Sequence, residues 1–337
     1  MLNGALIGFG KIAQSSHLAA YENPKIRENI KLTSVVEPND INREESKKQY
    51  PRLKFYKSFE DLLEENQIDF VDITTPPKFH KAVIEQGIKN NLNIISEKPF
   101  TLNLKEAEEI RDKLASYDKV FIPCHQYKHL QLWKEFKKVI DEVDPKEKFF
   151  LQFNVFRQHA DPGLEVFNNP WRINKEVSGG GILADTGVHY LYLSIWFLGK
   201  PLNVTSNNFN LAHPEYGVED TSTVVIEFER GISQITLTWG SNSRHNSASL
   251  ISQNYSLSYS GGTELIKHSN QNEQKIIIPD PSDKVNYTSL YVSMFGEFID
   301  KINANSSSDE AINEAYESIK LLEACYLSAD EKRTIEL

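Results

Sequence analysis

The chain has 337 residues, of which 39% are hydrophobic and 25% charged, a composition that excludes a disordered protein and indicates a globular one. Its length exceeds one ordinary hydrophobic core, so we expect two domains. A formal net charge of -10 argues against a general nucleic-acid or acidic-membrane surface. Cys124 and Cys325 are too few for a disulfide framework, and no apolar run is long enough to span a bilayer. We therefore expect a cytoplasmic protein that binds neither nucleic acid nor membrane.

The first predicted unit is a strand, a glycine turn and a helix over residues 3–13. An apolar run is followed by GFGKIA, which has the form G-x-G-x-x-A. Gly8 permits a tight turn, Gly10 lets the backbone approach a pyrophosphate, and Ala13 lets the helix pack closely on the strand. We therefore predict a dinucleotide site, with a purely structural turn as the alternative. Its residues are Gly8, Phe9, Gly10, Lys11, Ile12 and Ala13.

A second strand is predicted over residues 30–36, and it ends at Glu37. An acidic side chain at this point accepts hydrogen bonds from the adenosine ribose and repels a 2′-phosphate. Glu37 therefore favours NAD over NADP as the cofactor. The alternative is a solvated carboxylate in a loop.

Strands and helices continue to alternate up to Pro123. Further strands are expected over residues 68–73, 92–96 and 119–124, and helices over 79–90 and 104–117. This alternation predicts a Rossmann-type, doubly wound parallel sheet of the α/β class. Such folds bind ligands at the carboxyl ends of their strands. The loop after residues 68–73 therefore supplies further cofactor candidates: Thr74, Thr75, Pro76 and His80.

The second half of the chain changes character. Strands are expected over residues 149–157, 202–211, 221–228, 232–239, 247–260 and 274–278, and helices over 130–141, 188–198, 287–302 and 309–328. Many of these strands alternate apolar and polar residues, which predicts a large, mostly antiparallel open sheet in an α+β domain. An exposed sheet face suits a homodimer or homotetramer. We predict a cofactor domain over residues 1–123 and a substrate and oligomerisation domain over 124–337.

Several motifs occur along the whole chain: GFGKIA at 8–13, TTPPKFH at 74–80, SEKPF at 96–100, NPWR at 169–172 and GGGILADTGVH at 179–189. Together, and in this order, they resemble the glucose-fructose oxidoreductase/inositol dehydrogenase (Gfo/Idh/MocA) family. The resemblance implies an NAD(P)-dependent enzyme that oxidises or reduces a carbinol carbon on a sugar, a cyclitol or a related small molecule.

The resemblance implies that Lys98 of the EKP motif lies beside the nicotinamide and donates a hydrogen bond to the reacting substrate oxygen. A cation near a developing alkoxide lowers its pKa, and an alkoxide releases hydride more readily than an alcohol does. In the family Glu97 lies alongside the cofactor, and the peptide bond before Pro99 is often cis.

Asp185 and His189 are four residues apart at the start of a predicted helix, so we expect both on one face. Histidine is the natural proton carrier near neutral pH. The resemblance implies that His189 is the general acid/base and that Asp185 positions the substrate. The alternative is a helix-capping aspartate beside a packed histidine. Gly179 to Gly181 would let the backbone pass close to the ligand.

Trp171 and Arg172 match the family's Trp-Arg pair, whose arginine tends to approach the cofactor phosphates; a surface arginine beside a packed tryptophan is the alternative. His125 and Tyr127 stand where the family often has Asn and Arg, in a loop that usually borders the substrate. We therefore expect both to be substrate-binding residues, and residues 159–169 to form a further wall.

We therefore expect an NAD-dependent oxidoreductase that acts on a sugar, a cyclitol or a nucleotide-linked sugar, with Lys98 and His189 assisting proton transfer. No metal is expected, because no metal-ligand spacing supports one. Two alternatives remain open. One is an enzyme that uses NAD transiently for elimination or glycoside cleavage, and the other is a non-catalytic NAD-binding sensor.

Overall fold

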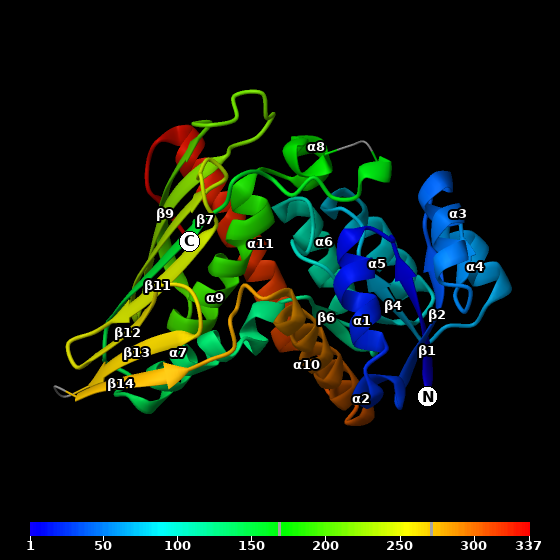
Figure 1. Ribbon diagram of the computed structural model, residues 1–337, viewed down its shortest axis with the longest axis horizontal. Helices are drawn as coiled ribbons and strands as arrows, with labels where there is room; N and C mark the ends of the chain where they lie inside the picture. Colours follow the sequence, from blue (N-terminus) through cyan, green and yellow to red (C-terminus); the bar gives the residue numbers. More distant parts are fainter. Residues whose placement is uncertain (168–169, 270–271) are drawn as a thin grey trace. The chain divides into compact units, whose positions relative to one another are not determined.

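The structure is a computed structural model that describes residues 1–167, 170–269 and 272–337, and its chain forms two compact units (Figure 1). The first unit consists of Met1–Gln126, Asp161–Trp171 and Tyr287–Tyr316. The second consists of Tyr127–Ala160, Arg172–Asn286 and Glu317–Leu337. Two segments that lie beyond residue 160 therefore belong to the first unit together with residues 1–126. The proposed boundary at residue 123 stays a prediction.

The first unit contains a parallel sheet of six strands in the order β3-β2-β1-β4-β5-β6. The strands are β1 (Leu2–Ile7), β2 (Ile30–Val36), β3 (Lys54–Tyr56), β4 (Phe70–Ile73), β5 (Asn93–Ser96) and β6 (Phe121–Pro123). The order reverses between β1 and β4, which is the switch point at which doubly wound sheets bind their ligands. The predicted Rossmann-type fold is confirmed.

Helices cover both faces of this sheet. They are α1 (Leu18–Tyr21), α2 (Pro24–Arg27), α3 (Asp40–Gln49), α4 (Phe59–Glu65), α5 (His80–Lys89), α6 (Leu104–Leu114) and α10 (Lys284–Asn303). On one face, Tyr291, Phe295 and Phe298 of α10 join the core formed by α1 and the strands. On the other, Gly87 of α5 lies so close to Ile94 that a methyl group would come within 2.9 Å of it.

The second unit contains a sheet of nine strands in the order β14-β13-β12-β11-β7-β10-β9-β8-β15. They are β7 (Phe149–Phe156), β8 (Pro201–Phe209), β9 (Thr221–Phe228), β10 (Gly231–Thr238), β11 (His245–Ile251), β12 (Tyr255–Tyr259), β13 (Glu264–Ser269), β14 (Asn272–Ile277) and β15 (Ile335–Glu336). Only the β7–β10 pair is parallel among the pairings of the described strands, which confirms a large, mostly antiparallel sheet.

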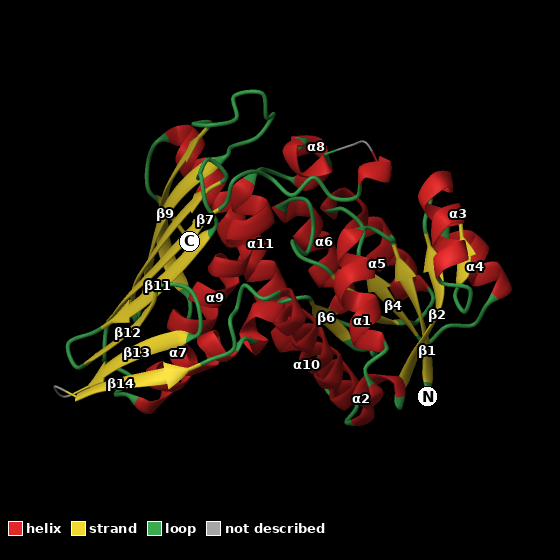
Figure 2. Ribbon diagram, in the orientation of Figure 1, coloured by secondary structure: helices red, strands yellow, loops and turns green. Residues whose placement is uncertain are grey.

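The helices of this unit are α7 (Gln131–Glu142), α8 (Lys175–Ser178), α9 (Val188–Leu198) and most of α11 (Asp309–Glu331). The apolar helix α9 packs on β7 and β10 (Figure 2). Its bounds are those predicted from the sequence. The continuous strand expected over 247–260 is wrong: a turn at residues 252–254 divides it, and the Ser252 amide donates to the Tyr255 carbonyl at 2.8 Å.

Both motif helices contain a wide π-helical turn near their start, where the sequence predicts an ordinary α-helix. The first covers Ala13–His17, directly after the glycine turn. The second covers Leu183–Gly187, directly before α9. Isolated π-helical turns are rare in proteins as a whole, and those that occur often lie at functional sites.

Candidate active site

The glycine turn after β1 has the geometry that a close approach to a cofactor requires. Gly8 has a φ of +93°, and a methyl group there would lie 3.0 Å from the Thr75 amide nitrogen. A side chain is therefore excluded at Gly8 by both conformation and space. At Gly10 an added methyl group would meet no atom within 4 Å, so the backbone is open on that side.

Glu37 follows β2 and its carboxylate faces the glycine turn. It is 2% exposed, and it accepts hydrogen bonds from the Phe9 amide at 3.1 Å and from the Asn42 side chain at 2.9 Å, both at one oxygen. The other oxygen accepts from the Asn39 amide at 2.8 Å. The carboxylate thus anchors the turn and retains acceptor capacity at only one oxygen for a ribose hydroxyl.

The loop after β4 lies beside the same turn. The Thr74 hydroxyl donates to the Gly8 carbonyl at 2.7 Å. The Thr75 hydroxyl oxygen is buried and has no hydrogen-bond partner among the residues that the structure describes. An orphaned buried hydroxyl at a glycine turn is a group that a bound dinucleotide can satisfy. Together with the open space at Gly10, it shows that the residues present fit such a cofactor.

His80 was expected to face the cofactor, but its side chain is fully buried. Its Nδ1 lies 2.8 Å from the Pro99 carbonyl oxygen and its Nε2 lies 2.8 Å from the Thr75 carbonyl oxygen. Burial lowers the pKa of His80, against the opposing influence of these two carbonyls. His80 therefore bridges the loop after β4 and the turn after β5, through its contacts with the two carbonyl groups.

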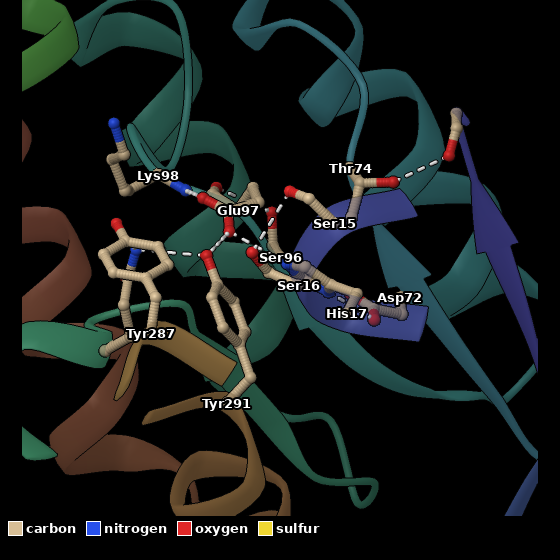
Figure 3. A network of polar contacts seen from close by, with 12 residues as sticks. Ser15, Ser16, His17, Asp72, Thr74, Ser96, Glu97, Lys98, Tyr287 and Tyr291 are labelled. Atoms are coloured by element: carbon tan, nitrogen blue, oxygen red, sulfur yellow. Dashed lines mark hydrogen bonds and ion pairs between the residues drawn. The ribbon is translucent and has the colours of Figure 1, made fainter. Parts of the chain in front are cut away.

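Glu97, Lys98 and Pro99 follow β5, and the Lys98–Pro99 peptide bond is cis. One oxygen of Glu97 accepts from the Lys98 amide at 3.1 Å. The other accepts from the Tyr291 hydroxyl at 2.8 Å and lies 3.0 Å from Nε2 of His17. The Lys98 side chain points away from this cluster (Figure 3). Glu97 thus fixes the backbone of the turn that carries Lys98, through its hydrogen bond with the Lys98 amide.

His17 lies at the centre of a buried polar network (Figure 3). Its Nδ1 is 2.7 Å from an oxygen of Asp72, which also accepts from the Tyr21 hydroxyl at 2.9 Å. Carboxylates only accept, so both ring nitrogens of His17 carry protons. Burial lowers the pKa of His17, but Asp72 and Glu97 outweigh it and raise the pKa to about 9.

Three side chains of this region, His17, Glu97 and Cys124, bring possible metal-ligand atoms within 4.8 Å of one another. Both nitrogens of His17 already donate to carboxylates, so neither offers a lone pair to a metal. Burial raises the pKa of the Cys124 thiol well above its ordinary value, which keeps it protonated. The donors are therefore engaged as an ion-paired network.

Lys11 of the glycine turn forms an ion pair with Asp161, whose carboxylate lies 2.8 Å from the Lys11 ammonium. Asp161 belongs to the 159–169 segment that was expected to form a substrate wall; residues 168–169 lie outside the described residues. Trp171 is the last residue of this segment of the first unit, and it begins a short 3-10 turn, Trp171–Ile173.

In the second unit, Gly180 and Gly181 serve packing within the chain. A methyl group at Gly180 would lie 1.8 Å from the Tyr326 hydroxyl, and one at Gly181 would lie 2.0 Å from the Glu219 carbonyl oxygen. That the backbone of these glycines passes close to a ligand stays a prediction, because this packing concerns only the side that a Cβ atom would occupy. The buried Glu219 carboxylate accepts from the amides of Gly181 and Leu183, at 2.9 and 3.1 Å, and fixes the start of the π-helical turn.

Asp185 lies in this π-helical turn and His189 in α9. The wider turn changes the angular offset of residues four apart, and the expected placement of Asp185 and His189 on one face stays a prediction. The Asp185 carboxylate accepts from Arg172 Nε at 3.1 Å. Arg172, expected near cofactor phosphates, is thus paired with the residue expected to position the substrate.

Two tyrosines, Tyr127 and Tyr192, contact the His189 side chain. The Tyr127 ring stacks on the imidazole, with centroids 4.0 Å apart and an interplanar angle of 9°. Nδ1 of His189 lies 2.9 Å from the Tyr192 hydroxyl, which accepts from the Tyr127 amide at 3.1 Å. A hydroxyl both donates and accepts, so this arrangement suits a neutral and a protonated imidazole alike.

His125, expected at the substrate, is 5% exposed, and its Nδ1 is paired with Glu314 at 2.5 Å, within the first unit. Four residues that support the motif residues were not predicted from the sequence: His17, Asp72, Tyr192 and Glu219. The spacing of His17 from Gly10 and of Tyr192 from His189, seven and three residues, was available as a signal that both lie on motif helices.

The parallel sheet, its strand order and the glycine turn after β1 are those of a dinucleotide-binding fold. A family model for the NAD-binding Rossmann fold of the Gfo/Idh/MocA oxidoreductases matches residues 2–125, and a model for the C-terminal domain of the same family matches residues 150–262. The chain belongs to the Gfo/Idh/MocA family. The predicted family, its enzymatic class and an NAD cofactor are thereby confirmed.

The chain is similar to a D-glucoside 3-dehydrogenase of Escherichia coli, at 23% identity over 68% of each chain. It is also similar to an NADP-dependent scyllo-inositol 2-dehydrogenase of Bacillus subtilis, at 22% identity over 60% of each chain. Other curated relatives are matched over about half of their length. The crystal structure of an inositol dehydrogenase homologue from Azotobacter vinelandii with NAD+ has a TM-score of 0.84 at 18% identity, over 100% of this chain and 97% of that one.

None of the helices in the described part of the chain combines the length and apolarity that crossing a membrane requires.

Proposed function

We propose that the protein is an NAD-dependent dehydrogenase that acts on the carbinol carbon of a sugar, a cyclitol or a nucleotide-linked sugar. The observation that carries this proposal is His189, whose ring is stacked on Tyr127 and whose Nδ1 has a hydroxyl partner in Tyr192. This arrangement suits a proton carrier. The named activities of the relatives on glucosides and inositols support the substrate class.

When bound, the nicotinamide ring accepts or donates the hydride. The glycine turn and the Thr75 hydroxyl would hold the dinucleotide, and Glu37 favours NAD because a carboxylate repels a 2′-phosphate. Lys98 would donate a hydrogen bond to the substrate oxygen and stabilise negative charge there. His189 would take the hydroxyl proton at Nε2 while Tyr192 orients the ring. Asp185, with Arg172, would position a neighbouring substrate hydroxyl.

A screen of sugars and cyclitols with NAD+, followed by NADH absorbance, tests the proposal. We expect net NADH formation with at least one polyol, and its loss in Lys98→Met and His189→Asn variants that still bind the cofactor. Cofactor cycling without net NADH favours transient oxidation for elimination or glycoside cleavage. Binding of NAD without turnover of any compound favours the sensor. NADP bound more tightly than NAD contradicts the role of Glu37.

We also propose that the outer face of the second unit's sheet forms a homodimer or homotetramer. Phe150 pairs across the sheet with Ile232 and with Ile251, and the three side chains are 38–43% exposed. Neighbouring exposed apolar side chains on one face indicate a protein interface. Light scattering of the purified protein gives the mass, and an Ile232→Lys variant should reduce it to that of the monomer.

A further inference from the structure

The buried network around His17 has no part in the hydride-transfer chemistry proposed above. Its residues come from separate elements: His17 from the helix after β1, Asp72 from β4, Glu97 from the end of β5 and Tyr291 from α10. The His17 ring lies between the two carboxylates, at 2.7 and 3.0 Å. Such a buried ion network is costly to assemble, because each charge loses its hydration.

The network carries a net negative charge. One imidazolium faces two carboxylates, while the nearby hydroxyls of Tyr21 and Tyr291 donate and stay neutral because burial raises their pKa values. Burial opposes ionisation of Glu97, but His17, Lys98 and Tyr291 together outweigh burial and lower the pKa of Glu97. Cys124 also stays protonated. Lys98 supplies an opposite charge nearby, with its side chain directed away from the cluster (Figure 3).

Glu97 is the least buried of the three charged side chains in the network. The side chains of His17 and Asp72 are fully buried, whereas that of Glu97 is 7% exposed. Glu97 also stands directly after β5, at the edge of the sheet where this fold places its ligands. The position and angle of its carboxylate are set by His17 and Tyr291 at one oxygen and by the Lys98 amide at the other.

We propose that His17 is a positioning residue that holds Glu97 as an oriented anion at the cofactor edge of the sheet, and that this anion makes the protein bind NAD+ more tightly than NADH. This inference rests on the proposed function, because it requires a nicotinamide cofactor. The physical reason is charge: the oxidised nicotinamide ring is a cation and the reduced ring is neutral. A fixed carboxylate in a poorly hydrated site therefore discriminates between them.

The test compares dissociation constants for NAD+ and NADH, measured by tryptophan and NADH fluorescence without substrate. In Glu97→Gln, which removes the charge and keeps the shape, we expect the ratio of the NADH to the NAD+ constant to fall by about tenfold. His17→Gln should also lower the ratio, because Glu97 loses the partner that contributes most to favouring its ionised form and to fixing its position. The double variant should match Glu97→Gln, since both changes act through one charge.

Phe298→Leu is the matched control, because Phe298 is fully buried in the same core but is uncharged. It should lower stability and leave the ratio unchanged. If His17→Gln does not fold, Tyr291→Phe replaces it, with a smaller fall in the ratio because only one hydrogen bond to Glu97 is lost.

A ratio that is unchanged in Glu97→Gln, or two constants that rise in parallel in His17→Gln, would overturn the inference and leave the dehydrogenase proposal intact. Wild-type protein that binds neither NAD+ nor NADH would overturn both.

Discussion

His17 in the first unit and His189 in the second each lie at or just after a π-helical turn that follows a glycine-containing motif. Both side chains are nearly inaccessible, at 0% and 4% exposed. Their neighbours differ, however: two carboxylates contact His17, whereas an aromatic ring and a hydroxyl contact His189. The same residue on similar backbone thus becomes a fixed cation in one unit and a candidate proton carrier in the other.

The largest expected effect separates the two histidines by activity. His189→Asn should lower kcat by roughly 10²- to 10⁴-fold, because a general acid/base is removed, while the dissociation constant for NAD+ changes little. Steady-state NADH formation with a polyol that the wild type oxidises measures this change. Circular dichroism checks that the variant is folded. If kcat stays within a few-fold of wild type, His189 is only a packed helix residue.

The second effect concerns stability, and it should appear at His17. Its pKa rises from 6.5 to about 9 in the folded protein, so its contribution is fully present below pH 6.5 and is lost as pH rises through 9. Urea unfolding of the wild type should therefore show a decrease of about 3 kcal/mol between pH 6.5 and 9. His17→Gln should lack this decrease. Other groups titrate in both proteins, so the difference between the two curves isolates His17.

If the wild-type and His17→Gln curves are parallel, the buried ring is neutral and the contrast between the histidines is wrong. Asp72→Asn offers a milder change at the same network, because His17 keeps Glu97 as a partner. It should show a smaller pH-dependent decrease than the wild type over the same range.

The contrast also shows what the sequence could predict. The alternation of strands and helices, the turn at Gly8 and the apolar helix α9 depend on neighbouring residues, and the fold followed from them. Lys98 and His189 lie in short motifs. The surroundings of His17 are different, because Asp72 is 55 residues away and Tyr291 is 194 residues from its partner Glu97. No local pattern links residues that only the folded sheet and α10 bring together.

The π-helical turns and the short strand β3 could not be predicted either, because neither has a distinct local residue pattern. A π-helical turn has nearly the residue pattern of an α-helix, so Asp185 and His189 were given α-helical geometry. Strand β3 has only three residues and lies beside β2, too short for an alternating pattern to reveal it. His80 and Glu219 look like ordinary polar loop or helix residues until their burial is known.

The next effect tests the hydroxyl partner of His189. Tyr192→Phe removes the group that contacts Nδ1 and accepts from the Tyr127 amide, so kcat should fall about fivefold through poorer orientation of the ring. The pH dependence of kcat/KM should also shift. Tyr190→Phe is the matched control, because Tyr190 lies on the same helix and contacts Tyr127 edge to face. Equal losses in both variants would indicate packing, not orientation of His189.

The smallest effect comes from an exposed ion pair in the unit that contains His17. The side chains of Lys11 and Asp161 are 44% exposed each, so water and salt screen their 2.8 Å contact. Asp161→Asn should lower the free energy of unfolding by only about 0.5 kcal/mol at low salt, and by less at high salt. Urea unfolding at two salt concentrations measures both values. A loss of about 3 kcal/mol, the contribution expected from ionised His17, would contradict this. It would mean that two nearby charges are enough for such an effect and that burial between two carboxylates is not needed.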